Sequence, residues 1–175
     1  MDKVFRFSTA GVLAVAVLTA SACASEQPAS GPMAGNVTVE NQWANAAETG
    51  MAAVFGSLAN TGGSDVQIVG GNSPQAGHVE IHEVVVNELG GKTMREKDGG
   101  LTVPAGGTRE LIPGGDHLML MDLTQPLLPG ADITVTLEFQ DGSTLPVTAQ
   151  VRDFAGGSEE YTPNTDGDGG AHHHG

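Results

Sequence analysis

The chain has 175 residues, with 7 Lys and Arg against 21 Asp and Glu, so its formal net charge is −14. A chain this acidic lacks the basic surface that nucleic acids and anionic membrane surfaces attract, and we exclude both as electrostatic partners. Its 26 glycines and 9 prolines, with only 16% charged residues, favour short strands joined by many turns over a helical bundle.

The N-terminal part of the chain carries the pattern of an export signal. Two basic residues precede an apolar run that ends in small residues, which predicts a signal peptide over residues 1–22. The single cysteine, Cys23, follows at once, as in a bacterial lipobox. We expect Cys23 to be lipidated, because an unpaired exposed thiol is unusual in a secreted protein; plain secretion is the alternative. The protein would then be exported and held by its lipid at the outer face of the cytoplasmic membrane or in the periplasm.

A tether joins the lipid anchor to the folded domain in this prediction. Residues 23–35 contain the cysteine and a run rich in Pro, Gly and Ser, which is typical of a flexible linker. The folded domain is expected to span residues 36–154.

Within that domain, short alternating runs separated by glycine and proline turns predict about eight or nine strands. The expected strands include 37–40, 53–59, 66–69, 78–86, 108–112, 114–123, 133–139 and 145–151. Regular spacing of this kind predicts a single all-β domain, either a β-sandwich or a Greek-key barrel. Trp43, the only tryptophan, is expected to fill part of the core.

The last segment, residues 155–175, is rich in Gly, Asp and Glu and predicts a disordered acidic tail. Three consecutive histidines near its end, His172, His173 and His174, can bind a metal ion loosely, and Cu(II) is the candidate. The alternative is that these histidines are the remains of a purification tag.

The residues with metal chemistry centre on segment 114–123, Gly-Gly-Asp-His-Leu-Met-Leu-Met-Asp-Leu. Alternation in a strand places two leucines on one face and His117, Met119 and Met121 on the other. Same-face neighbours lie about 6–7 Å apart at Cα, so His117 and Met119 can contact one ion. Imidazole and thioether ligands suit Cu(I) and disfavour Mg²⁺ and Ca²⁺. The alternative is a core strand in which methionine merely fills space.

Two more histidines lie on a second predicted strand. His78 and His82 share a face but are about 13 Å apart at Cα, so at most one of them can join His117 and Met119. Met94 follows a Gly-Gly turn after this strand, and a hairpin would return it towards His82.

Together these segments resemble the periplasmic copper chaperones of the PCu(A)C (PCuAC, DUF461-type) family, which have a cupredoxin-like β-sandwich. The resemblance covers roughly residues 37–152. It rests on segments 60–65, 79–83, 94–95, 103–107 and 113–123. The family motif is a His, a Met about ten residues on, and His-x-Met about twenty further, which implies His82, Met94, His117 and Met119 as copper ligands. The two intervals hold eleven and twenty-two residues, each about one longer than the usual motif.

The resemblance implies a Cu(I)-binding chaperone outside the cytoplasm. It would deliver copper to a membrane oxidase, at the CuA site of cytochrome c oxidase, through an oxidase subunit or another copper chaperone. Met121 and His78 remain secondary candidate ligands. Thioethers suit this setting because they bind Cu(I) without the thiol oxidation to which a cysteine site is exposed.

Other functions remain as alternatives or are excluded. A copper sequestration or resistance lipoprotein would use the same site, and a metal-free adhesion or scaffold domain would use the methionines as core. A blue-copper electron carrier needs a Cys thiolate beside two His, and the only cysteine is Cys23. The sequence contains no hydrolase, metalloprotease or phosphate-loop motif, so we do not expect an enzyme.

Overall fold

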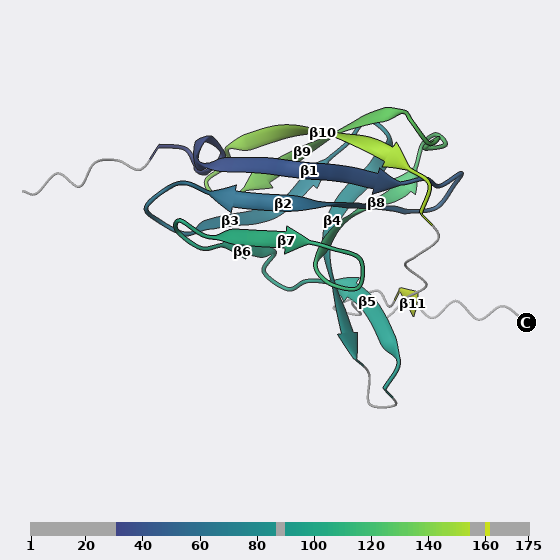
Figure 1. The fold of residues 1–175 in the computed structure, drawn as a ribbon, viewed down its shortest axis with the longest axis horizontal. Helices are drawn as coiled ribbons and strands as arrows, with labels where there is room; N and C mark the ends of the chain where they lie inside the picture. Colours follow the sequence, from purple (N-terminus) through teal and green to yellow (C-terminus); the bar gives the residue numbers. More distant parts are fainter. Residues whose placement is uncertain (1–30, 87–89, 155–159, 162–175) are drawn as a thin grey trace, which may run out of the picture.

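The computed structural model describes residues 31–86, 90–154 and 160–161, and Figure 1 shows their arrangement. Apart from the four-residue 3-10 helix η1 (Met33–Asn36), the regular elements of these residues are all β-strands. The strands are β1 (Val37–Asn45), β2 (Ala52–Asn60), β3 (Val66–Asn72), β4 (Ala76–Val86), β5 (Lys92–Glu96), β6 (Leu101–Val103), β7 (Thr108–Leu111), β8 (His117–Leu123), β9 (Asp132–Phe139), β10 (Thr144–Arg152) and β11 (Glu160–Tyr161). The all-β prediction is confirmed. The strands β6 and β11 are too short to produce a clear alternation in sequence.

Seven strands close into a barrel. Their order is β4-β8-β2-β1-β10-β9-β3, and β3 pairs again with β4 to complete the circuit. Within this circuit only β1 and β10 pair in parallel. The strands β5 and β11 extend the sheet beyond β4, and the β4–β5 hairpin projects from the barrel (Figure 1). This hairpin carries three of the residues with predicted metal chemistry, His78 and His82 on β4 and Met94 on β5.

The core consists of inward-facing aliphatic side chains, as the low aromatic content requires. Strand β9 shows the pattern most clearly, because Ile133, Val135, Leu137 and Phe139 are buried and two of the three residues between them are exposed. Two-residue alternation of this kind places one set of side chains inside the barrel and the other set in solvent.

Trp43 does not belong to this core, contrary to the prediction. The register between β1 and β2 shifts between Glu40 and Trp43, and Asn41 has a φ of 55°. A bulge of this kind changes which face the following side chains occupy. Gly56 permits the bulge, because a Cβ at this position would lie 3.2 Å from the Glu40 carbonyl oxygen. Trp43 is therefore half-buried and packs against Phe55 with ring centroids 4.6 Å apart.

The packed part of the chain begins inside the segment predicted to be a tether. Met33 and Ala34 pack against the core. The backbone N–H of Met33 donates to Asp141 Oδ2 (2.7 Å), and that of Ala34 donates to Ser143 Oγ (3.0 Å). These contacts tie the start of the domain to the β9–β10 turn.

Replacing Asp141 by Asn is expected to lower the urea midpoint of unfolding slightly at pH 7. The Ser143 hydroxyl and the Met33 N–H hold the pKa of Asp141 below its ordinary value of 3.8. The carboxylate therefore stabilises the fold above pH 3.8, and this contribution disappears as the pH falls through the lowered folded-state pKa. Denaturation curves across pH 2–7 should show the two proteins converging in acid, whereas a constant difference would contradict the assignment. The charge-matched control is Asp132→Asn.

Several predicted features lie outside the described residues. These are the signal peptide, Cys23, the tether up to residue 30 and the tail histidines His172, His173 and His174. Two residues of the predicted tail are placed, because Glu160 and Tyr161 pair in parallel with Thr93 and Met94 of β5. Among residues 31–86, 90–154 and 160–161, no helix is long and apolar enough to cross a bilayer.

Candidate metal centre

Strands β4 and β8 bring the predicted site residues into three cross-strand rows on one side of the sheet. His82 lies opposite His117, Glu80 opposite Met119, and His78 opposite Met121. We call these six residues the His–Met face. Side chains directly opposite each other in antiparallel strands lie about 4.5–5.5 Å apart at Cβ, so each row can bring its two side chains together.

The first row is buried and consists of two imidazoles. His82 is 0% exposed and His117 is 4% exposed, and their ring centroids lie 5.6 Å apart with an interplanar angle of 68°. The alternate residues of both strands, such as Ile81 and Leu118, belong to the barrel core. Strand alternation therefore separates a hydrophobic side from a side that carries two imidazoles, as predicted for β8.

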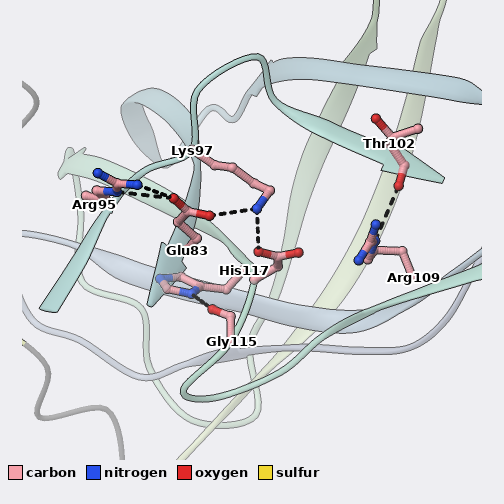
Figure 2. Close-up of polar contacts among 8 residues, drawn as sticks. Glu83, Arg95, Lys97, Thr102, Arg109, Gly115 and His117 are labelled. Atoms are coloured by element: carbon pink, nitrogen blue, oxygen red, sulfur yellow. Dashed lines mark hydrogen bonds and ion pairs between the residues drawn. The ribbon is translucent and has the colours of Figure 1, made fainter. Parts of the chain in front are cut away.

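Hydrogen bonds orient both rings. His117 Nδ1 lies 2.9 Å from the Gly115 carbonyl oxygen (Figure 2), and because a carbonyl only accepts, Nδ1 donates and Nε2 carries the lone pair. His82 Nε2 donates to Glu80 Oε2 at 2.6 Å, which makes Nδ1 the nitrogen with the lone pair. Such bonds fix the tautomer and orientation of histidines that bind metals.

The carboxylate of Glu80 is shared between two histidines. Its Oε1 lies 2.9 Å from His78 Nε2, and its Oε2 accepts from His82. Burial raises the pKa of Glu80, but the hydrogen bonds from His82 and His78 outweigh this and hold the pKa below its ordinary value. Glu80 is therefore a carboxylate at neutral pH. From the sequence alone, Glu80 was either a group that orients His82 or attracts the ion, or an ordinary surface glutamate.

The two methionines of the implied ligand set lie on opposite sides of His82. Met119 is 3% exposed and follows His117 by two residues on the same face. Met94 lies opposite Val84 and is half-buried, while Glu96 lies directly opposite His82. Met94 is thus a diagonal neighbour of His82, about 7–8 Å away at Cα. The hairpin returns Met94 to the His82 end of the sheet, and it sits at the edge of the group formed by His82, His117 and Met119.

The third row lies at the solvent end of the face. The His78 side chain is 52% exposed, and Met121 is half-buried. His78 Nδ1 lies 3.7 Å from Asp122 Oδ2, whose side chain is 83% exposed. His78 is therefore the surface histidine of the pair that the sequence identified.

Aromatic rings cover the His117 end of the face. The ring centroids of Phe55 and His117 lie 6.0 Å apart, and those of Phe154 and Trp43 lie 5.1 Å apart. Trp43 itself packs on Phe55. This cluster shields the paired histidines from water. The sequence analysis missed it, because it depends on the bulge in β1 and on the β2–β8 register.

An ion-pair network fixes the hairpin on the other side of the sheet. Glu83 accepts from Arg95 (2.9 Å) and from Lys97 (2.7 Å), as Figure 2 shows. Lys97 also lies 3.3 Å from Asp116, next to His117. The hydrogen bond from Lys97 holds the pKa of Glu83 below its ordinary value. The network ties the strand that carries Met94 to the turn before β8.

A solvent-open pocket of about 550 Å³ lies beside the middle row. Its lining includes Glu80, Glu96, Lys97 and Asp98. In the described part of the chain, no group of three or more His, Cys, Asp or Glu is placed to hold a metal ion. The first row offers two imidazole nitrogens, and Met119 adds a thioether sulfur in the neighbouring row of the same face. This donor set fits a soft monovalent ion such as Cu(I).

Comparisons with known proteins agree with this fold. The chain is 43% identical over 165 residues to "Putative lipoprotein Lxx21020" of Leifsonia xyli subsp. xyli (strain CTCB07), covering 92% of this chain and 99% of that protein. The structure of the present chain resembles the copper-bound PCuAC domain from PmoF2, with a TM-score of 0.57 and 19% identity over 69% of this chain and 95% of that domain. It also resembles the solution structure of CuI-DR1885 from Deinococcus radiodurans, with a TM-score of 0.51 and 32% identity over 68% of this chain and 81% of that one.

The likeness to the PmoF2 domain confirms the expected cupredoxin-like fold of PCuAC domains. The sequence model of the family described as "Putative lipoprotein LpqE-like" matches residues 37–151, which is nearly the whole described barrel and more than half of the chain. On this match and on the identity to the Leifsonia protein, the chain belongs to the LpqE-like family.

Proposed function

We propose that this protein is an extracytoplasmic Cu(I)-binding chaperone, anchored to a membrane by a lipid on Cys23. The observation that carries the proposal is the pair of buried, opposed imidazoles, His82 and His117, with the Met119 thioether on the same face. The Cu(I)-bound state of DR1885, a relative at 32% identity, supports the same cargo here. The family and its lipoprotein relative support the anchor.

The chemistry of the proposed site suits a carrier. Imidazole and thioether are neutral donors, and thioether sulfur favours Cu(I) over the hard cations that are abundant outside cells. Hydrogen bonds to Gly115 and Glu80 hold the two rings in place before the ion arrives, so little ordering is required on binding. A thioether does not titrate, so the Met119 sulfur remains a neutral donor over a wide pH range.

The ion would bind to His82 Nδ1, His117 Nε2 and the Met119 sulfur, with Met94 as the ligand at the edge. Phe55 and the aromatic rings behind it exclude water from this end of the face. Exclusion of water and oxygen protects a bound Cu(I) from oxidation. Release then requires a partner that offers competing ligands, which is the behaviour of a chaperone.

The direct test is an anaerobic titration of the full chain with Cu(I) in competition with a chromophoric chelator. The three tail histidines are replaced by alanine in one sample to separate their contribution. We expect one tightly bound Cu(I) per chain in both samples. No binding above background in either sample would contradict the proposal.

Replacing Met94 by Leu is expected to weaken Cu(I) binding by about tenfold, in the range of a supporting residue rather than a central ligand. The reason is its diagonal position across from His82, beside Glu96. The same competition assay measures this loss of affinity. Met33→Leu is the matched control, because it makes the same replacement at a methionine that packs near the β9–β10 turn and is not part of the His–Met face. A loss as large as that of His117→Ala would instead show that the hairpin closes fully over the ion.

A chaperone must pass its copper to another protein. We propose delivery to an oxidase, at the CuA site of cytochrome c oxidase, directly or through another copper chaperone. A strain lacking this protein should lose oxidase activity in low copper and regain it on copper addition. A copper sequestration protein uses the same ligands, and its loss would instead lower tolerance to excess copper with oxidase activity unchanged.

A further inference from the structure

The His–Met face runs without interruption from a buried end to a solvent-exposed end. Exposure rises along β4 from His82 (0%) through the Glu80 side chain (16%) to the His78 side chain (52%). On β8 the burial runs in the same direction, from His117 and Met119 to the half-buried Met121. Every row of this face contains at least one side chain that can bind Cu(I).

An ion cannot easily enter the proposed site from another molecule, because the ligands of that site are buried. The rise in exposure along the His–Met face provides a way in. Cu(I) is scarce as a free ion, so it passes between molecules by ligand exchange, in which the incoming ligand contacts the metal before the outgoing one leaves. Side chains that are 0–4% exposed cannot contact an ion still held by another molecule. A ligand at the surface has to make the first contact.

We propose that His78 and Met121 form this surface acceptance site for Cu(I), from which the ion moves along the face to His82, His117 and Met119. The inference rests on the copper-carrying function proposed above. The two residues are direct cross-strand partners, so one imidazole nitrogen and one thioether sulfur can bind the same ion. The ion remains Cu(I) throughout, because each step only exchanges one ligand for another.

The middle row connects the two ends. Met119 lies two residues from both Met121 and His117, about 6–7 Å from each at Cα. Its sulfur can therefore bind the ion together with Met121 first and with His117 afterwards. The two ends are about 13 Å apart at Cα along β4, which makes them separate sites and not one.

Negative charge at the exposed end supports a cation pathway. Glu80 hydrogen-bonds both His78 and His82 and so spans the gap between the two sites. Asp122 has a φ of 53°, which departs from strand geometry, and its carboxylate lies 3.7 Å from His78 Nδ1. Both carboxylates can attract a Cu(I) ion to the exposed end of the His–Met face without being strong ligands for it.

The test separates the rate of copper uptake from its affinity. Anaerobic stopped-flow mixing of the full chain with the Cu(I) complex of a bulky chromophoric chelator gives the rate, and equilibrium competition gives the affinity. The double variant His78→Ala with Met121→Leu is compared with wild type and with Met33→Leu, all with the tail histidines replaced by alanine. Far-ultraviolet circular dichroism checks that each variant is folded.

We expect the double variant to take up Cu(I) about tenfold more slowly, within the range over which association rates vary among variants of one interface. Its equilibrium affinity should stay within about twofold of wild type, because the ligands of the buried site are intact. Met33→Leu should match wild type in both measurements.

Three results would overturn the inference. Unchanged uptake in the double variant would show that the ion enters elsewhere, and slow uptake in Met94→Leu would then place the entrance at the hairpin. A loss of affinity as large as that of His117→Ala would make His78 and Met121 part of the tight site. Absence of Cu(I) binding in the wild type would overturn the proposed function itself, and this inference with it.

Discussion

Replacing His117 by alanine is expected to reduce Cu(I) affinity by at least about 100-fold. Loss of a side chain that merely orients a ligand already costs about 10–100-fold, and His117 is proposed to bind the ion itself. His117 is 4% exposed and lies directly opposite His82, so no other described side chain occupies an equivalent place. The measurement is anaerobic competition for Cu(I) with a chromophoric chelator.

The matched control is His78→Ala, which removes an imidazole from the same face. Because His78 is half exposed and lies two rows from His117, its loss should leave the equilibrium affinity almost unchanged. If the two variants lost affinity equally, or if His117→Ala bound copper as wild type does, the buried row would not be the binding site.

Replacing Leu120 by alanine is expected to destabilise the fold by about 2–5 kcal/mol, the usual cost of truncating a fully buried leucine. Leu120 is 0% exposed and faces the barrel core from β8, between Met119 and Met121. Urea denaturation of the copper-free chain measures the loss. The folded fraction should keep its Cu(I) affinity, because the neighbouring ligands point to the other face.

Met119→Leu, on the same strand, is expected to have the opposite effect from Leu120→Ala: it should lower Cu(I) affinity and change stability little. Methionine and leucine have similar volumes, so the substitution should cost less than about 1.5 kcal/mol of stability. It removes the sulfur, so Cu(I) affinity should fall. If Met119→Leu kept full affinity, Met119 would be core filler, as the alternative interpretation of the β8 sequence holds.

The two-residue period of β-strands explains why much of this site could be predicted. Alternation alone assigned His117 and Met119 to one face of β8, and His78 and His82 to one face of β4. The Gly90-Gly91 turn predicted that Met94 returns towards His82. Strand positions follow from local sequence, and the closed barrel adds only the way these strands pair.

Cross-strand register is the information that local sequence lacked. Whether Met94 or Glu96 lies opposite His82 depends on the length and shape of the hairpin turn, and a shift of one residue moves a side chain to the other face. The roles of Glu80 and Phe55 likewise depend on neighbours from other strands. Trp43 was placed in the core because it is the only tryptophan, and the sequence did not reveal the bulge at Asn41 that changes the face its side chain occupies.

X-ray absorption at the copper K-edge of the Cu(I)-loaded protein tests the central claim most directly. The sample is the full chain with the tail histidines replaced by alanine, loaded with one equivalent of Cu(I) without oxygen. We predict an edge typical of Cu(I) and directly bound atoms that include both nitrogen and sulfur, with the sulfur contribution reduced in Met119→Leu. A spectrum with only nitrogen or oxygen neighbours, unchanged by that substitution, would contradict a histidine–methionine copper site on this face.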